Sequence, residues 1–126
     1  MKKILIIDDS LMDRKLLSSL LKKFGIANEV LQACDGEEGF KVLSENVNDI
    51  GVILLDWQMP KVDGIAFMKT VVKVPGFNAV PIIMITASGS DDNKKQAYDA
   101  NPNLSAYVVK PYRPENLIEL IKPFLV

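Results

Sequence analysis

Five short apolar runs alternate along the chain with five segments that carry apolar residues at helical spacing. Residues 4–7, 50–55 and 80–87 are almost continuously apolar, which is typical of strands buried on both faces of a parallel sheet. Two shorter runs, at residues 29–34 and 106–109, predict the remaining strands. Because strands and helices alternate strictly, we predict an α/β fold with right-handed crossovers, in which helices cover both faces of a parallel five-stranded sheet.

The first predicted helix lies between the first two strands and ends at Gly25. Its apolar residues fall into a stripe spaced four apart, Met12, Leu16 and Leu20, and a flank, Leu17, Leu21 and Phe24. This spacing is typical of an amphipathic helix, and we predict that the stripe faces the core.

Proline marks the ends of the later helices. The third predicted helix ends at Pro75, and the last begins at Pro114 and includes Phe124. Between them, residues 90–100 permit a helix but are only weakly amphipathic. The clearest apolar positions of this segment are Ala97, Tyr98 and Ala100. We predict that this helix packs shallowly and can therefore move at little cost.

The composition is that of an ordinary globular domain. With 126 residues, 48% hydrophobic and 25% charged, the chain is expected to form one domain, residues 1–126. No apolar run approaches the roughly 20 residues of a membrane helix, so we expect a cytoplasmic protein without membrane contact. The net charge of -1, without a basic stripe, argues against nucleic-acid binding by this chain alone.

Two residue counts restrict the chemistry further. Cys34 is the only cysteine, which excludes an internal disulfide and any site built from several cysteines. Histidine is absent, so the commonest acid, base and metal ligand at neutral pH is excluded, together with every histidine-dependent triad. Any chemistry must therefore use carboxylates, lysines, hydroxyls or a bound metal.

Several polar residues come directly at the ends of the predicted strands. They are Asp8 and Asp9 after the first strand, Asp56 after the third, Thr86 and Ala87 at the end of the fourth, and Lys110 after the fifth. Each alone is ordinarily a helix cap or a solvated loop residue. However, the carboxyl ends of parallel strands share one edge of the sheet, which is where ligands bind in such folds.

Crowded carboxylates repel one another unless a cation compensates for their charge. Oxygen ligands of this kind suit Mg2+, which typically binds one or two carboxylates together with water and phosphate oxygens. In this interpretation Asp56, which arrives alone on its strand, is the nucleophile that becomes an aspartyl phosphate. Lys110 and Thr86 would hold the phosphoryl oxygens by charge and by a hydroxyl hydrogen bond.

The stretches "ILIIDDS", "ILLDWQMPKVDG", "PIIMITA" and "YVVKP", in this order and spacing, resemble the receiver domain of bacterial two-component response regulators. The resemblance covers essentially the whole chain and is greatest to the single-domain chemotaxis type. It implies a flavodoxin-like, doubly wound (βα)5 fold with the strand order 2-1-3-4-5, an order for which the chemotaxis regulator is a standard example.

The resemblance also implies roles for individual residues. The Mg2+ ligands would be Asp8, Asp9, Asp56 and the backbone carbonyl of Gln58, and the sequence leaves open which of Asp8 and Asp9 coordinates directly. Asp56 would be the phosphoacceptor, and Thr86, Ala87 and Lys110 would bind the phosphoryl group. Thr86 and Tyr107 would form the switch pair, and the Lys110–Pro111 bond would be cis.

Partners follow from the same resemblance. The phosphoryl donor would be a phosphohistidine on a sensor histidine kinase or a histidine phosphotransfer protein, since this chain has no histidine of its own. An effector would bind the face formed by the helix at residues 90–100, the last strand and the last helix. Candidate contacts there, which equally fit a solvated face, are Lys94, Lys95, Tyr112 and Arg113. We expect a monomer or weak dimer, and a phosphoacceptor with self-phosphorylation and self-dephosphorylation chemistry rather than an enzyme.

Three alternatives share parts of this pattern. A degenerate receiver that only binds proteins would not need the full set of acids. In a flavodoxin-like electron carrier, Asp8 and Asp9 would repel a flavin phosphate, and a Mg2+-dependent aspartyl phosphatase would need an acid where Gln58 stands. Gln58 and Ser88 occupy positions that tune phosphoryl lifetime in receivers, and their identities leave that lifetime open.

Overall fold

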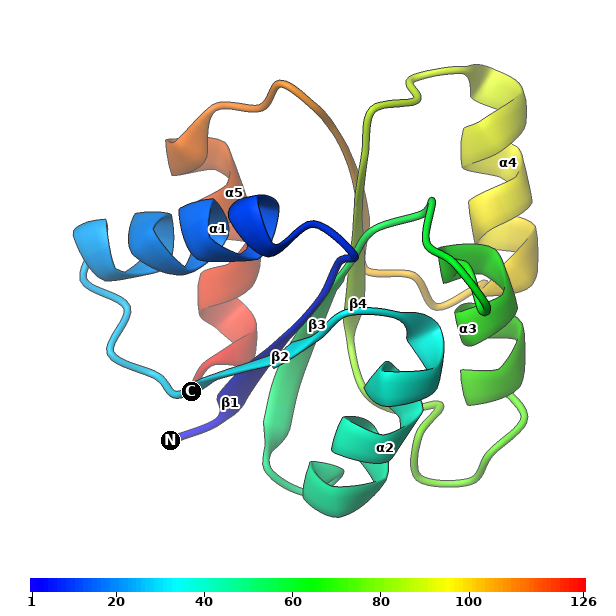
Figure 1. The fold of residues 1–126 in the computed structure, drawn as a ribbon, viewed down its shortest axis with the longest axis horizontal. Helices are drawn as coiled ribbons and strands as arrows, with labels where there is room; N and C mark the ends of the chain where they lie inside the picture. The colour runs from blue at the N-terminus through cyan, green and yellow to red at the C-terminus, as the bar shows by residue number, and fades with distance from the viewer.

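The computed structural model describes residues 1–126 as a five-stranded parallel sheet between two layers of helices (Figure 1). The elements follow in the order β1 (Lys3–Ile7), α1 (Leu11–Lys23), β2 (Val30–Ala33), α2 (Gly36–Asn46), β3 (Ile50–Leu55), α3 (Gly64–Val71), β4 (Ile82–Thr86), α4 (Asp91–Ala100), β5 (Ala106–Val109), α5 (Pro114–Ile121) and the 3-10 helix η1 (Lys122–Phe124). The strand order is β2-β1-β3-β4-β5 and every neighbouring pair is parallel. The predicted fold class and strand order are therefore confirmed.

The register of the sheet brings the ends of distant strands to the same level. Ile7 of β1 pairs with Leu55 of β3, so Asp8 and Asp56 are the next residues on adjacent strands. The amide of Asp56 donates to the carbonyl of Ile7 at 2.9 Å, which extends the ladder one residue further. Since parallel strands all end at one edge, the sheet itself places the two carboxylates side by side.

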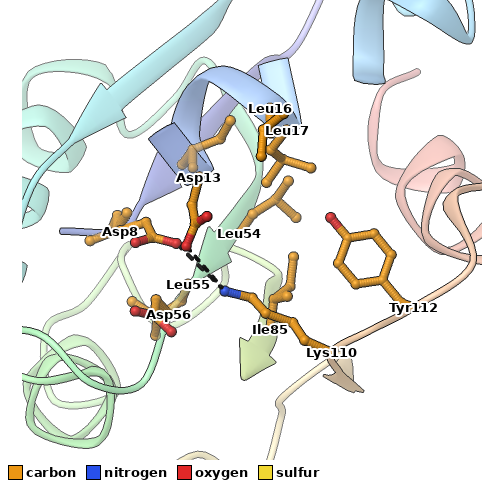
Figure 2. A pocket seen from close by; sticks show the side chains of 12 residues that line it. Asp8, Asp13, Leu16, Leu17, Leu54, Leu55, Asp56, Ile85, Lys110 and Tyr112 are labelled. Carbon is orange, nitrogen blue, oxygen red and sulfur yellow. Dashed lines mark ion pairs between the residues drawn. The ribbon is translucent and has the colours of Figure 1, made fainter. Parts of the chain in front are cut away.

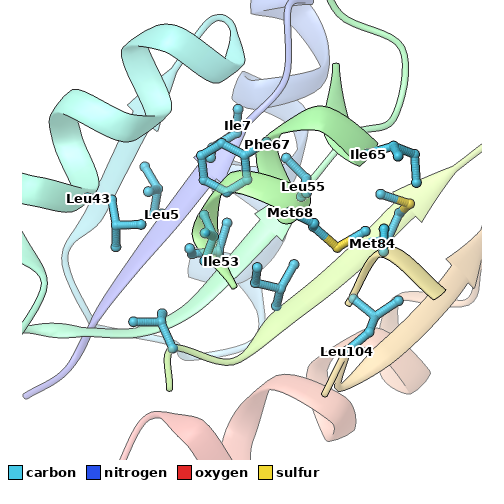
Figure 3. Packing of buried hydrophobic residues seen from close by; sticks show 14 of the residues in the cluster. Leu5, Ile7, Leu43, Ile53, Leu55, Ile65, Phe67, Met68, Met84 and Leu104 are labelled. Atoms are coloured by element: carbon cyan, nitrogen blue, oxygen red, sulfur yellow. The ribbon is translucent and has the colours of Figure 1, made fainter. Parts of the chain in front are cut away.

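Each face of the sheet has its own apolar core. The helices α2, α3 and α4 cover one face, and α1 and α5 cover the other (Figure 1). Phe67 of α3 is fully buried in the first core (Figure 3). Its ring stacks on that of Phe40 in α2, with centroids 4.7 Å apart. Because β1, β3 and β4 contribute side chains to both cores, their continuous apolar runs are required by the architecture.

The apolar stripe predicted for α1 is wrong in its orientation. Leu17 and Leu21 are buried, whereas Met12 and Leu16 are 71% and 63% exposed, and of the predicted stripe only Leu20 packs partly against the core. Adjacent leucines at two successive helical turns offer two apolar faces with the same spacing, and the spacing alone does not select between them. The helix therefore exists as predicted but is rotated, so that the predicted flank packs against the sheet.

Four further predictions can be compared with the structure: the ends of two helices, the packing of α4 and one cis peptide bond. The helix α3 ends at Val71 and not at Pro75, and α5 gives way to η1 at Lys122, where Pro123 cannot continue an α-helical hydrogen-bond ladder. The shallow packing of α4 is confirmed, since only two small alanines are buried and Tyr98 lies exposed. The Lys110–Pro111 peptide bond is cis, as predicted. No helix has the length and apolarity needed to cross a membrane.

Candidate functional site

Three carboxylates converge at the carboxyl edge of the sheet. Asp8 and Asp9 follow β1, Asp56 follows β3, and one carboxylate oxygen from each lies within 4.8 Å of the other two. Asp8 is 8% exposed, Asp56 is half-buried and Asp9 is exposed. The backbone amide of Ser10 donates to Oδ1 of Asp8 at 2.9 Å, which fixes the orientation of the most buried of the three.

Burial and mutual repulsion act on the protonation of this cluster. Burial, with the charge of Asp8 as the second cause, raises the pKa of Asp56 to about 6, although Lys110 partly opposes the rise. The pKa of Asp8 is also raised, mainly by burial, and the Ser10 amide and Lys110 oppose the rise. Ionisation of these carboxylates is therefore energetically unfavourable, and a bound cation would reduce that cost.

Lys110 provides the positive charge at the site. Its Nζ lies 3.7 Å from Oδ2 of Asp13 and 3.9 Å from Oδ2 of Asp8, while Asp56 forms no ion pair with it (Figure 2). The amide of Lys110 donates to the carbonyl of Thr86 at 2.8 Å, so the backbone of β4 sets the position of the lysine. The ammonium thus faces the acids from the opposite side of the site.

The loop after β3 holds the Asp56 backbone in place. The amide of Gly64 donates to the Trp57 carbonyl at 2.8 Å, and a Cβ at Gly64 would lie only 2.5 Å from the Asp56 carbonyl oxygen. Only glycine permits this close approach. The carboxylate of Asp63 then accepts a hydrogen bond from the amide of Ala66 at 2.8 Å and caps α3, which fixes the far end of the loop.

Ser88 connects the end of β4 to two other elements. Its amide donates to Oγ1 of the buried Thr86 at 3.3 Å, and its carbonyl accepts a hydrogen bond from the Tyr107 hydroxyl of β5 at 2.7 Å. Its own hydroxyl oxygen accepts a hydrogen bond from the side-chain amide of Asn93 in the first turn of α4. Thr86, Tyr107 and α4 therefore share one residue as their common contact.

A cavity of about 140 Å³ opens between the acids and the apolar face beneath α1. Its polar lining residues are Asp8, Asp13, Asp56, Lys110 and Tyr112 (Figure 2), and its apolar lining is Ile6, Ile7, Leu16, Leu17, Leu54, Leu55 and Ile85. The cavity therefore adjoins Asp56 directly and is bounded by α1 on one side and by the segment after β5 on the other.

The predicted site residues do not all meet in this cavity. Asp8, Asp56 and Lys110 line it. Asp9 belongs to the carboxylate cluster but does not line the cavity, and neither does Thr86, whose carbonyl accepts a hydrogen bond from the Lys110 amide. The side chains of Gln58 and Ala87 are exposed and do not line it. The Gln58 carbonyl as a metal ligand and Ala87 as a phosphate contact therefore stay predictions.

Two residues of the site were missed in the sequence. Asp13 lies in the first turn of α1, which begins directly beside the end of β1, and an acid at that position could have been suspected of facing the same edge. Tyr112 was predicted on the effector face, but it is half-buried and lines the cavity. Of the other predicted effector contacts, Lys94, Lys95 and Arg113 are exposed.

The donor set fits a hard divalent cation. Three carboxylates offer only oxygen ligands, they lie close enough to share one ion, and the largest relief of their repulsion would come from a positive charge among them. The thiol of Cys34, the single cysteine, contacts Asp35 in the turn before α2 and Glu38 on α2. It therefore does not add a soft ligand to the carboxylate cluster. Mg2+ or a similar ion matches this chemistry.

Comparison with known proteins identifies relatives along nearly the whole chain. The response regulator receiver domain family model matches residues 4–122. The chemotaxis protein CheY1 of Helicobacter pylori is 35% identical over 123 residues, which cover 98% of this chain and 96% of that protein. The structure of the chemotaxis response regulator CheY4 of Vibrio cholerae superposes with a TM-score of 0.84 at 30% identity, covering 99% of both chains. The Mn(2+)-bound form of response regulator Rcp1 gives a TM-score of 0.76 at 27% identity, covering 99% of this chain and 90% of that one.

Proposed function

The chain belongs to the response regulator receiver domain family, and on this premise we propose that it is a phosphorylation-activated switch in which Asp56 accepts a phosphoryl group from a partner phosphohistidine. The protein is thus a receiver domain of two-component signalling, a phosphoacceptor and not a classical enzyme. We further propose that residues 1–126 form one such domain and that it works in the cytoplasm, where phosphohistidine donors are present.

One observation supports this function most directly. Asp8, Asp9 and Asp56 gather within 4.8 Å at a strand edge, and Lys110 faces them across a cavity that adjoins Asp56. A purely structural cluster would pair its acids with enough cations to keep their pKa values low, whereas here the pKa of Asp56 is raised to about 6. The arrangement instead suits a dianionic group bound together with a cation.

The reaction is a transfer between two nucleophiles. A carboxylate oxygen of Asp56 forms a bond to phosphorus as the bond between phosphorus and the donor histidine nitrogen breaks. The electron pair of the broken bond stays on that nitrogen, which takes a proton to leave a neutral imidazole. Lys110 and the Thr86 hydroxyl hold the phosphoryl oxygens during transfer, and the backbone amide of Ala87 contributes a further donor.

Asp8, Asp9, Asp56 and the Gln58 carbonyl are the residues that would hold Mg2+. The ion would supply positive charge that offsets the repulsion between the acids and the incoming phosphoryl oxygens. The Mn(2+)-bound structure of the related regulator Rcp1 supports a divalent cation here. Asp8 is the most constrained of the acids, since Ser10 and Lys110 already engage its oxygens, and Asp9 has the freer carboxylate for direct coordination.

An apolar rim lies along one side of the site. Leu11, Met12 and Leu16 are 54%, 71% and 63% exposed on the first half of α1, beside Asp13 and the cavity. A histidine kinase or phosphotransfer protein that presents its phosphohistidine to Asp56 would cover this rim. Met12 and Leu16, which were predicted to face the core, would thus belong to the donor-binding surface instead.

The structural change at Thr86 would be transmitted to Tyr107 and α4 through Ser88. When a phosphoryl group draws the Thr86 hydroxyl toward itself, the hydrogen bond from the Ser88 amide is lost, and Ser88 also contacts Tyr107 and Asn93. The shallow packing of α4 lets the helix respond at little cost. An effector protein that binds the α4-β5-α5 face would then distinguish the two states.

Phosphate incorporation tests the proposed function. The wild-type protein is incubated with radiolabelled acetyl phosphate or with a phosphorylated histidine phosphotransfer protein, with Mg2+ or with excess chelator. We expect label only when Mg2+ is present. Absence of label with every donor, combined with normal binding of an effector, would favour a degenerate receiver that acts only as a protein-binding module.

A further inference from the structure

Asp13 forms the shorter of the two ion pairs of Lys110. Its Oδ2 lies 3.7 Å from the lysine Nζ, against 3.9 Å for Asp8, and both carboxylates point at the ammonium from the α1 side of the cavity (Figure 2). Asp13 is set in this place by the helix start, because its amide donates to the Ser10 hydroxyl oxygen that caps α1 at 3.2 Å. It does not belong to the carboxylate cluster of Asp8, Asp9 and Asp56.

We propose that Asp13 is a positioning residue that holds the Lys110 ammonium on the α1 side of the site while Asp56 is unmodified. This inference rests on the proposed function, in which Lys110 binds the phosphoryl group on Asp56. Lys110 must then leave Asp13 when the phosphoryl group arrives. Asp13 thus opposes phosphorylation by competing for the one cation that the cavity lining provides.

The competition follows from the number of charges. Lys110 is the only basic residue that lines the cavity, and three acids, Asp8, Asp13 and Asp56, line it with the lysine. Once a divalent cation is shared among the acids of the cluster, Asp8 loses much of its attraction for the lysine. Asp13 stands outside that cluster and keeps its full charge, so it becomes the remaining competitor.

The size of the effect is limited by exposure. The side chains of Asp13 and Lys110 are 49% and 33% exposed, so water screens their attraction. Ion pairs of this kind typically change an equilibrium constant by about two- to fivefold. We therefore expect Asp13→Asn to bind beryllofluoride, a phosphoryl mimic, about two- to fivefold more tightly in the presence of Mg2+, and to accept phosphate faster.

A double-mutant cycle separates this role from simple repulsion of the anion by Asp13. Beryllofluoride affinity is measured calorimetrically for the wild type, Asp13→Asn, Lys110→Met and the double variant, with saturating Mg2+. If Asp13 acts through Lys110, its substitution has no effect in the Lys110→Met background. The same gain in both backgrounds would overturn the proposal and assign the effect to direct repulsion.

A matched control and a second measurement complete the test. Asp49→Asn removes an exposed acid from the turn before β3, outside both the cavity and the carboxylate cluster, and should leave the affinity unchanged. A crystal structure of Asp13→Asn without phosphate should show the Lys110 ammonium moved toward Asp56, and an unmoved lysine would contradict the proposal even if Lys110→Met binds too weakly to measure. Wild-type protein that fails to bind beryllofluoride would instead refute the proposed function, so the two failures are distinguishable.

Discussion

The hydroxyl of Tyr107 donates to the carbonyl of Ser88 at 2.7 Å, and the amide of the same serine donates to the Thr86 hydroxyl oxygen at 3.3 Å. The two residues of the predicted switch pair, Thr86 and Tyr107, therefore both contact Ser88, although they lie on different strands. A change in the position of Thr86 acts on Tyr107 through the loop that follows β4.

This relay predicts a difference between two substitutions of Thr86. Thr86→Ser keeps the hydroxyl and should preserve the change in the amide NMR signals of Tyr107 and α4 when beryllofluoride and Mg2+ bind. Thr86→Ala removes the hydroxyl, so the changes in α4 should be largely lost while those around Asp56 remain. An Ala variant that retains the full set of changes would show that the signal reaches α4 by another route.

The carboxylate cluster predicts the metal affinity of its variants. Asp8→Asn and Asp9→Asn each remove a charge from the site, so the Kd for Mg2+ should rise at least about tenfold. The fluorescence of Trp57, which directly follows Asp56 and is the only tryptophan, reports the titration. Asp49→Asn, an exposed aspartate outside the cluster, is the matched control and should bind as the wild type does. Equal affinities in all four proteins would place the metal elsewhere.

The raised pKa of Asp56 predicts how stability depends on pH. A carboxyl that is harder to ionise in the folded state than in the unfolded chain lowers the free energy of unfolding as the pH rises from about 4 through about 6. For Asp56 the loss is on the order of 1–2 kcal/mol, because water partly screens this half-buried carboxyl. Asp56→Asn should therefore be more stable than the wild type at neutral pH and similar to it near pH 4.

Urea unfolding at both pH values measures this difference. Adding Mg2+ should stabilise the wild type at neutral pH, because a bound cation offsets the same repulsion, and should do little for Asp56→Asn. A wild type whose stability rises through this pH range would show that other groups outweigh the acid cluster.

The orientation of α1 predicts unequal costs for two leucines that are five residues apart on the helix. Leu21→Ala removes a fully buried side chain and should lower the free energy of unfolding by about 2–5 kcal/mol. Leu16→Ala acts on a side chain that is 63% exposed and should cost less than about 1 kcal/mol. Thermal or urea unfolding of both variants checks this, and a larger cost at Leu16 would restore the stripe inferred from the sequence.

The strands and their ends could be predicted because each strand is marked by a short, local run of apolar residues, and the same pattern recurs along the chain. Apolar runs such as residues 50–55 must be buried on both faces, and once a parallel sheet follows from the alternation, Asp8 and Asp56 must share an edge. The choice between Leu16 and Leu17 was not predictable, since both lie in patterns of equal period. It depends on how α1 docks, which is a property of the assembled layers.

The same distinction applies to the site. Asp56 and Lys110 could be identified because each directly ends a strand, but Asp13 reaches Lys110 only through the direction in which α1 leaves β1. The contacts of Ser88 depend on the path of a loop, which single residue types do not specify. Contacts between neighbouring strand ends were thus foreseeable, and contacts set by helix docking and loop path were not.

Peptide mapping of the phosphorylated protein shows directly whether Asp56 is the residue that accepts the phosphoryl group. The protein is labelled in the presence of Mg2+, treated with borohydride to mark acyl phosphates, digested and analysed by mass spectrometry, with Asp56→Asn and the control Asp49→Asn in parallel. We expect one modification per chain, at Asp56, in the wild type and in Asp49→Asn, and none in Asp56→Asn. Full labelling of Asp56→Asn, or a modification mapped to another residue of the wild type, would contradict it.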